Sequence, residues 1–120
     1  PVDLTMGYAN LIGQDDAVDR IIRCLDLCAS PPAILNITGQ ETLKIKDLAL
    51  GLAQRLGKKV QFQGLEAKTA LLSNASRSYE IFGETRRGLD SWLDLLSDWV
   101  KAGGRDLGKP THFQTRDGKF

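Results

Sequence analysis

Strand-like and helix-like patterns of apolar residues alternate along the first half of the chain. Residues 2–8 alternate between apolar and polar side chains, as a half-buried strand does. Apolar residues recur at helical spacing over 15–28 and again over 43–56. The β-branched run 33–38 (AILNIT) predicts a buried strand between these helices, and the alternation of 59–63 (KVQFQ) predicts another after them. The pattern therefore indicates a small sheet covered by helices.

The first predicted helix has an apolar side, expected to face the core, and a charged side, expected to face water. Asp15 or Asp16 is expected to cap its start, because a carboxylate accepts hydrogen bonds from the free N–H groups there. The sequence Ser30-Pro31-Pro32 is expected to end it, since proline cannot continue a helix. The residues expected inside are Ala17, Val18, Ile21, Ile22, Leu25 and Cys28, and those expected outside are Asp19, Arg20, Arg23 and Asp26.

Two further helices are predicted in the second half of the chain. A short helix is expected over 73–82, before Gly83, and a longer one over 89–102. Asp90 or Ser91 is the expected N-cap of the longer helix. The residues of this helix expected to face inward are Leu89, Trp92, Leu93, Leu96, Trp99 and Val100.

These elements predict an α/β, or α+β-like, fold in which short strands form a small sheet packed by about four helices. Residues 1–104 are expected to form the folded lobe. Residues 105–120 have no periodicity and are rich in glycine and charge, so they are expected to form an extended C-terminal arm with Phe113 as its anchor.

The charges of the chain are balanced, with 16 basic and 15 acidic residues and a formal net charge of +1. Such a chain has no electrostatic footprint for nucleic acid and no attraction to acidic membranes. Its apolar runs are too short to span a membrane. Cys24 and Cys28 lie one turn apart without the further ligands of a zinc site, and are expected to be small buried hydrophobes. Reduced cysteines are compatible with the cytoplasm, which is the expected location.

The sequence carries none of the common catalytic motifs. It has no G-x-G-x-x-G loop, no Walker A loop and no zinc-ligand spacing, and its one histidine, His112, argues against a Ser/His/Asp or Cys/His site. Arg86 and Arg87 could clamp a phosphate, although solvation at the surface is the commoner outcome. Trp92 and Trp99 lie two helical turns apart, which indicates a core stripe more often than a stacking platform.

Five short sequence segments, taken in their order along the chain, form a recognisable pattern. Residues 13–17 (GQDDA) open a helix after a strand, and 34–39 (ILNITG) and 41–49 (ETLKIKDLA) follow as a strand and the entry to the next helix. Residues 72–83 begin with LSNA and end with FG, and 104–120 contain GKPTHFQTRDGKF. Together they resemble the C-terminal half of the NAD-dependent epimerase/dehydratase family, which belongs to the extended short-chain dehydrogenase/reductases. The last string is similar to a bacterial subgroup described as epimerases or oxidoreductases.

This resemblance covers almost the whole chain and implies a small substrate-binding lobe that packs on an N-terminal Rossmann domain. The family's cofactor loop and its Tyr-x-x-x-Lys catalytic pair lie upstream, and neither Tyr8 nor Tyr79 is followed by lysine four residues later. The resemblance therefore implies NAD(P) for the full-length parent, but no cofactor and no catalytic residue in this chain. The chain is expected to be inactive by itself.

The implied substrate is a small molecule of the nucleotide-sugar type. Position alone makes Asn10, Gln14 and Lys68 the candidate substrate contacts. The loop 66–74 departs from the family's diphosphate-binding loop, because it has Lys68 but no arginine, and Asn74 at the position of the aspartate. The net reaction stays open between epimerisation, dehydration and reduction.

Two hypotheses make different predictions for the surface. The chain opens with a strand-like segment, without a basic leader or an initiator methionine, so we expect a piece of a longer enzyme. That hypothesis predicts an exposed apolar patch where the Rossmann domain docks. The alternative is a stand-alone α/β protein- or ligand-binding module without enzymatic activity, which predicts a self-contained sheet.

Overall fold

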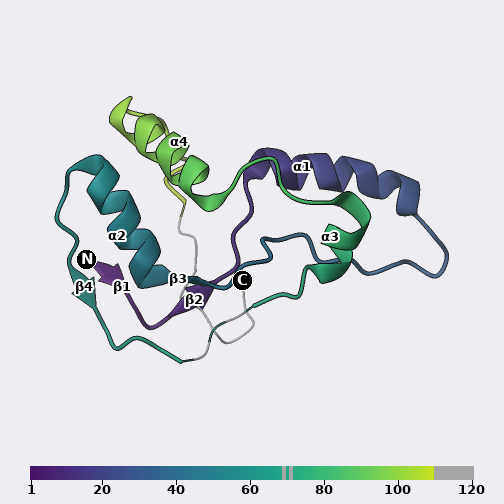
Figure 1. Ribbon diagram of the computed structural model, residues 1–120, viewed down its shortest axis with the longest axis horizontal. Helices are drawn as coiled ribbons and strands as arrows, with labels where there is room; N and C mark the ends of the chain where they lie inside the picture. Colours follow the sequence, from purple (N-terminus) through teal and green to yellow (C-terminus); the bar gives the residue numbers. More distant parts are fainter. Residues whose placement is uncertain (69, 71, 110–120) are drawn as a thin grey trace.

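The computed structural model describes residues 1–68, 70 and 72–109, and these form a mixed α/β fold (Figure 1). The described residues contain four α-helices, one 3-10 turn and four strands of two residues each. This confirms the predicted mixed class at a coarse level. The fold is elongated, with extents of 50 × 33 × 26 Å and a radius of gyration of 16.2 Å, against about 14 Å for a compact domain of this length.

The strands form two separate pairs, where one small sheet was expected. β1 (Val2–Asp3) is parallel to β4 (Phe62–Gln63), and β2 (Tyr8–Ala9) is antiparallel to β3 (Leu43–Lys44). The expected strand over 2–8 is thus divided in two. The predicted alternation of more buried and exposed positions is confirmed over 2–6, whereas Gly7, expected on the outer face, is buried.

A turn at Thr5 divides this strand. The Oδ1 atom of Asp3 accepts hydrogen bonds from the backbone N–H and the hydroxyl of Thr5, at 2.8 and 2.7 Å. An aspartate that bonds the backbone two residues later stabilises a turn in place of a continuing ladder. The backbone bond from Thr5 also lowers the pKa of the Asp3 carboxyl. Of the predicted strand 59–63, only β4 is paired.

Two helices pack together beside these strands. α2 (Ile45–Leu56) contacts α4 (Leu89–Lys101), and both are left of centre in Figure 1. Gly57 ends α2 in the left-handed conformation, with φ 62°, as its position predicts. Arg55 joins the helices, since its Nε lies 2.6 Å from Asp94 Oδ1 and its Nη2 lies 3.0 Å from Asp90 Oδ1. These contacts raise the pKa of Arg55, and the bond to Asp94 is the main cause.

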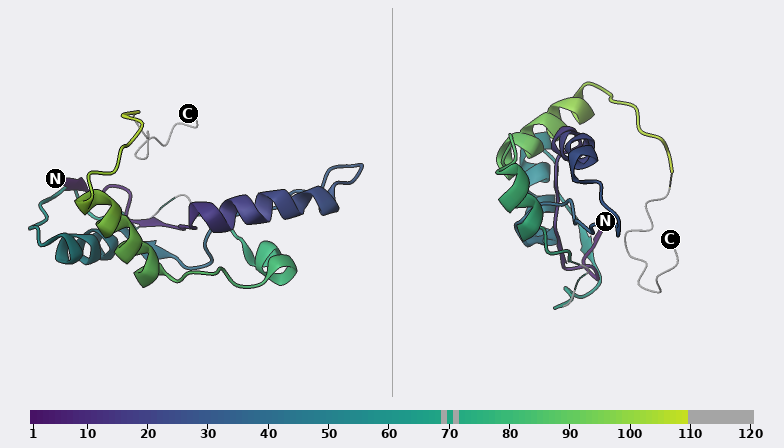
Figure 2. Two further views of the ribbon diagram at one scale, coloured as in Figure 1. Left: turned by 90° about the horizontal axis from the view of Figure 1, so that it is seen from above. Right: turned by 90° about the vertical axis from the view of Figure 1, so that its right-hand side faces the viewer.

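The opposite end of the molecule is built from α1 (Gln14–Arg23) and α3 (Ser76–Phe82), on the right in Figure 1. A 3-10 turn over Cys24–Leu27 extends α1 to nearly the predicted length. Figure 2 shows α1 as one long arm that projects from the strands, so few elements surround it. α3 ends at Gly83, with φ 78°, as predicted.

The predicted orientation of α1 is wrong. The apolar residues that were expected to face the core are exposed, by 46% at Val18, 58% at Ile21, 60% at Ile22 and 71% at Leu25. The charged side instead faces α3, and Arg20 is only 2% exposed. The physical reason is that α3 and the loop after it present hydrogen-bonding groups to α1, and no described apolar surface covers its other side.

The predicted strand over 33–38 is also not formed. Its backbone makes no hydrogen bond to the other described residues, and Ile34 is 85% exposed. The side chain of Asn36 does hold this segment locally, because its Nδ2 donates to the carbonyl oxygen of Asn74 at 3.0 Å. A strand exists only where a second strand pairs with it, and the described residues provide none at this place.

Several smaller expectations are corrected. Gly13 and Gly88 precede α1 and α4 in place of the predicted caps, and no side chain caps either helix. Cys28 is exposed and Cys24 half-buried, because the 3-10 turn lies at the open end of α1. The outer residues of α4 that were expected inside are exposed, by 43% at Leu96, 44% at Trp99 and 43% at Val100. Residues 105–109 have no regular structure, and the rest of the predicted arm, with Phe113, lies outside the described residues.

The described part of the chain has a small core. Its buried hydrophobic side chains are Leu4, Met6, Ala9 and Ala75, of which two are alanines. Such a core stabilises little, because a fully buried large aliphatic side chain contributes about 1.5–3 kcal/mol and alanine much less. No helix in the described ranges is long and apolar enough to cross a membrane.

Candidate functional site

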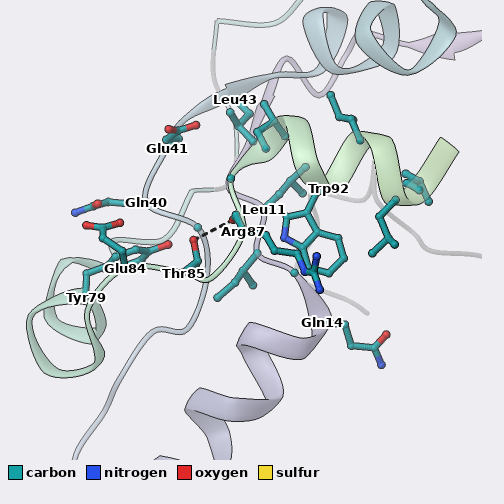
Figure 3. A pocket seen from close by; sticks show the side chains of 18 of the residues that line it. Leu11, Gln14, Gln40, Glu41, Leu43, Tyr79, Glu84, Thr85, Arg87 and Trp92 are labelled. Atoms are coloured by element: carbon teal, nitrogen blue, oxygen red, sulfur yellow. Dashed lines mark hydrogen bonds between the residues drawn. The ribbon is translucent and has the colours of Figure 1, made fainter. Parts of the chain in front are cut away.

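A cavity of about 670 Å³ opens between α4 and the segments that lead into α1 and β3 (Figure 3). Its wall is formed by residues of the segments 11–14, 39–43 and 84–89, by Tyr79 of α3 and by one side of α4. Its surface is mainly apolar, with Leu11, Ile12, Leu43, Leu89, Trp92, Leu93, Leu95, Leu96 and Trp99. A concave apolar site with few polar groups is the usual form of a small-molecule site.

Two glycines allow the walls of this cavity to come together. A Cβ atom at Gly13 would overlap the indole ring of Trp92, so the ring lies directly on the backbone before α1. A Cβ atom at Gly39 would overlap the carbonyl oxygen of Leu11, so the two segments cross at close range. Both glycines, which were predicted to interrupt the chain after a strand, therefore allow close packing at the site.

One end of the cavity is basic. The guanidinium carbon of Arg87 lies 5.9 Å from the centre of the Trp92 ring, and its Nε lies 3.4 Å from Asp15 Oδ2. Neither terminal nitrogen of Arg87 donates a hydrogen bond to a described residue. The indole Nε1 of Trp92 is buried and also has no partner among the described residues. Several N–H donors of this end are therefore unused.

The other end of the cavity is acidic and polar. Figure 3 shows Gln40, Glu41, Glu84 and Tyr79 grouped together, away from Trp92. These side chains provide carboxylate, amide and phenol groups that can accept or donate hydrogen bonds. The cavity thus has an apolar middle with opposite charges at its two ends.

A buried polar cluster holds the loop that carries Arg87. The Oδ1 atom of Asp16 accepts a hydrogen bond from the backbone N–H of Arg86 at 3.0 Å, and Arg86 Nη2 lies 2.9 Å from Asp19 Oδ1. Asp16 is 4% exposed, and its second oxygen has no partner among the described residues. The position of the loop at the basic end of the cavity is therefore fixed from α1.

Arg20 is the centre of the contact between α1 and α3. Its Nη1 donates to Ser78 Oγ at 3.2 Å, and its Nη2 donates to the carbonyl oxygen of Gly83 at 2.7 Å. Its guanidinium lies 4.0 Å from the centre of the Tyr79 ring, which is a close cation–π contact. This residue was expected to face water, and the structure places it where it orders the wall of the cavity.

The three predicted substrate contacts lie in different surroundings. Gln14 is exposed and lines the cavity. Asn10 lies behind the wall, where its Nδ2 donates to the carbonyl of Glu41 at 2.9 Å and its Oδ1 accepts from the N–H of Ser73 at 2.9 Å. Lys68 is exposed and does not line the cavity. The structure therefore brings Gln14 to the site, gives Asn10 a structural role and leaves Lys68 apart.

Another lysine, Lys44, makes a close contact with the loop that precedes Lys68. Its Nζ lies 2.7 Å from Glu66 Oε1, and this hydrogen bond raises the pKa of Lys44. The pair ties β3 to the loop after β4, outside the cavity wall. Its effect is on the fold and not on the site.

Several residues of the cavity were named from the sequence, but their proximity to one another was not predicted. Arg87 was one of two arginines expected either to clamp a phosphate or, more commonly, to be solvated at the surface, and Trp92 was expected in the core. A signal was present at Gly13 and Gly39, because glycine next to an apolar strand often marks a close backbone approach. The partner at each approach comes from elsewhere in the chain, so its identity requires the structure. In the described part of the chain, no group of three or more metal-ligating side chains is assembled.

No family model, curated protein or solved structure matches the chain.

Proposed function

We propose that this chain is the C-terminal, substrate-binding portion of a two-domain NAD(P)-dependent enzyme of the epimerase/dehydratase type. In this proposal, an N-terminal Rossmann domain provides the cofactor loop and the catalytic tyrosine. The chain by itself binds no cofactor and catalyses no reaction. It occurs in the cytoplasm as part of the longer protein.

The exposed side of α1 carries this proposal. Val18, Ile21, Ile22 and Leu25 form a contiguous stripe along α1, with roughly half to three-quarters of each side chain in contact with solvent. Burial of a large aliphatic side chain stabilises by about 1.5–3 kcal/mol, so a helix with this pattern gains greatly from an apolar cover. Contiguous exposed apolar patches mark interaction surfaces. An N-terminal domain docked on this stripe would complete the core.

The unpaired segment 33–38 supports the same proposal. A short β-branched run whose backbone makes no hydrogen bond with the other described residues is suited to pair with a neighbouring strand. The chain turns back after α1 before it reaches this segment, so both features belong to the same end of the molecule (Figure 1). A strand of a second domain could therefore pair with 33–38 while the same domain covers α1.

The role of the chain in such an enzyme would be to hold the substrate. The chemistry is a hydride transfer to and from the bound nicotinamide, with a tyrosine of the other domain as acid and base. Positioning of the reacting carbon against the nicotinamide accounts for much of the rate enhancement of such reactions. Gln14 at the edge of the cavity is the candidate contact of this chain with the substrate.

The mass of the natural gene product tests this proposal. An immunoblot of its source with an antibody against this chain is expected to detect a protein of roughly 300 residues, the size of a Rossmann domain plus this lobe. A product close to 13.2 kDa, the mass of this chain, would contradict the proposal.

The cavity favours a second candidate function, a ligand-binding module without enzymatic activity. Its described wall comes from this chain alone, so a second domain is not needed to form it. In this case the stripe on α1 would bind a separate protein. A natural product of 13.2 kDa that still binds a small molecule would support this function.

A further inference from the structure

We propose that the cavity beside Trp92 binds a flat, apolar small molecule that carries one anionic group, with the anion at Arg87. This site is formed by the present chain, so the inference does not rest on a second domain or on the proposed enzymatic role. It concerns the chemical class of the ligand and the residue that selects it.

The size and wall of the cavity indicate a small ligand. Its volume of about 670 Å³ lies within the range of roughly 300–1,000 Å³ that is typical of small-molecule sites. The chain has two tryptophans, Trp92 and Trp99, and both line it. Flat aromatic side chains together with leucines favour a flat apolar body, because offset-stacked rings gain energy beyond the area that they bury.

The position of the charges indicates the polarity of the ligand. Arg87 has two terminal nitrogens that donate no hydrogen bond to a described residue, at the end of the cavity next to Trp92. A carboxylate, sulfonate or phosphate would form charge-assisted hydrogen bonds with them, which are roughly twice as strong as hydrogen bonds between neutral groups. Glu41 and Glu84 line the opposite end, so an anion there would be repelled.

The buried residue Asp16 sets the position of the loop that carries Arg87. Asp16 holds the backbone of Arg86, and the neighbouring Arg87 extends toward the cavity. This bond sets the position of the backbone from which Arg87 extends, while the side chain of Arg87 remains 45% exposed. Asp15 is its one acidic contact among the described residues, at 3.4 Å and partly exposed to solvent, and a ligand anion can compete with such a contact.

The test uses two probes with the same aromatic body, naphthalenesulfonate as the anion and naphthalenemethanol as the neutral control. Binding is followed in the intact chain by the two indole N–H signals in an ¹⁵N-correlated NMR spectrum, assigned with a Trp99→Phe variant. The expected result is saturable binding of the sulfonate at a single site, with a shift of the Trp92 signal. The neutral probe is expected to bind roughly tenfold more weakly, the loss that follows from one charge-assisted interaction.

Matched variants locate the anion. Arg87→Gln is expected to weaken sulfonate binding by roughly tenfold, and Arg77→Gln, a change at an exposed arginine of α3 that does not line the cavity, by less than about twofold. Leu96→Glu places a carboxylate in the apolar wall at a half-exposed position and is expected to abolish binding. Ile21→Ser with Ile22→Ser, on the stripe of α1, is expected to leave binding unchanged.

Three results would overturn the proposal. The first is binding that the α1 variant removes and Arg87→Gln does not change, because the probe would then lie on the stripe. The second is equal affinity for the two probes, which would remove the role of the anion. The third is no binding of the sulfonate at millimolar concentration to a chain whose NMR spectrum is folded. None of these results depends on the mass of the natural gene product, so they leave the proposed function to its own test.

Discussion

α1 and α2 have similar amphipathic sequences, but their apolar sides have different surroundings. The apolar side of α2 lies against α4, and only Leu50 among its large hydrophobic residues is strongly exposed. The apolar side of α1 faces solvent, while its charged side makes the buried contacts of Arg20 with α3. The comparison shows that periodicity identifies the two sides of a helix, and that the available partners decide which side is buried.

The difference also divides the molecule into two regions. The region of α2, α4 and the strands has its own small core, centred on Leu4 and Met6. The region of α1 and α3 is held by hydrogen bonds and ion pairs and leaves its apolar residues uncovered. If this division is correct, the same kind of substitution has a different effect in each region.

The largest effect is expected in the region of the strands. Leu4→Ala removes a side chain that is 6% exposed and leaves a cavity, which is expected to lower the free energy of unfolding by about 2–5 kcal/mol. Urea denaturation followed by circular dichroism measures this change. An effect below that of an exposed leucine, such as Leu65→Ala, would contradict the assignment of the core to this region.

An effect of intermediate size is expected when the buried charge of α1 is removed. Arg20→Ala loses two hydrogen bonds and the contact with Tyr79, and is expected to cost about 2–3 kcal/mol. Arg77→Ala, at an exposed position of α3, is the control and is expected to cost less than about 0.5 kcal/mol. Equal losses for the two arginines in urea denaturation would show that the polar side of α1 is not the packed side.

A smaller effect is expected on the apolar side of the same helix. Ile21→Ser with Ile22→Ser changes two residues that are about 60% exposed, and is expected to shift the free energy of unfolding of this chain by less than about 0.5 kcal/mol. In the full-length parent, the same pair is expected to weaken the association of the two domains, which limited proteolysis would detect. A large loss of stability in the chain alone would mean that the stripe is already covered.

The smallest effect is a pH dependence of the region of the strands. The hydrogen bond to Glu66 raises the pKa of Lys44 above its ordinary value of 10.5, so the contribution of this pair is fully present below that value. It is lost as the pH rises through the pKa of the folded state. Lys44→Met is expected to remove this component of the alkaline loss of stability, measured as the unfolding midpoint against pH. An unchanged alkaline profile in the variant would exclude a contribution from Lys44.

Local sequence signals predicted the elements better than the packing. The ends of α2 and α3 follow from Gly57 and Gly83, whose positive φ values of 62° and 78° favour glycine. The alternation around Leu4 and Met6 also predicted their burial. Neither the division of this strand at Thr5 nor the absence of a strand at 33–38 could be predicted, because both depend on partners that periodicity does not specify.

The candidate site was less predictable than the fold for the same reason. Gln14 was selected because it lies at the start of a helix after a strand, and the structure places it at the cavity. Arg87 reaches the cavity only because Asp16 anchors the backbone of Arg86, 70 residues away in the sequence. A contact of this range leaves no local pattern, so the pairing of Arg87 with Trp92 required the structure.

The central claim is that another domain covers the apolar side of α1. Hydroxyl-radical footprinting of the natural gene product and of this chain by itself tests it most directly, through the oxidation rates of Ile21, Ile22 and Ile34. The expected result is strong protection of these three residues in the natural product, with unchanged oxidation of an exposed control such as Leu107. Equal oxidation of the stripe in both samples would contradict the claim.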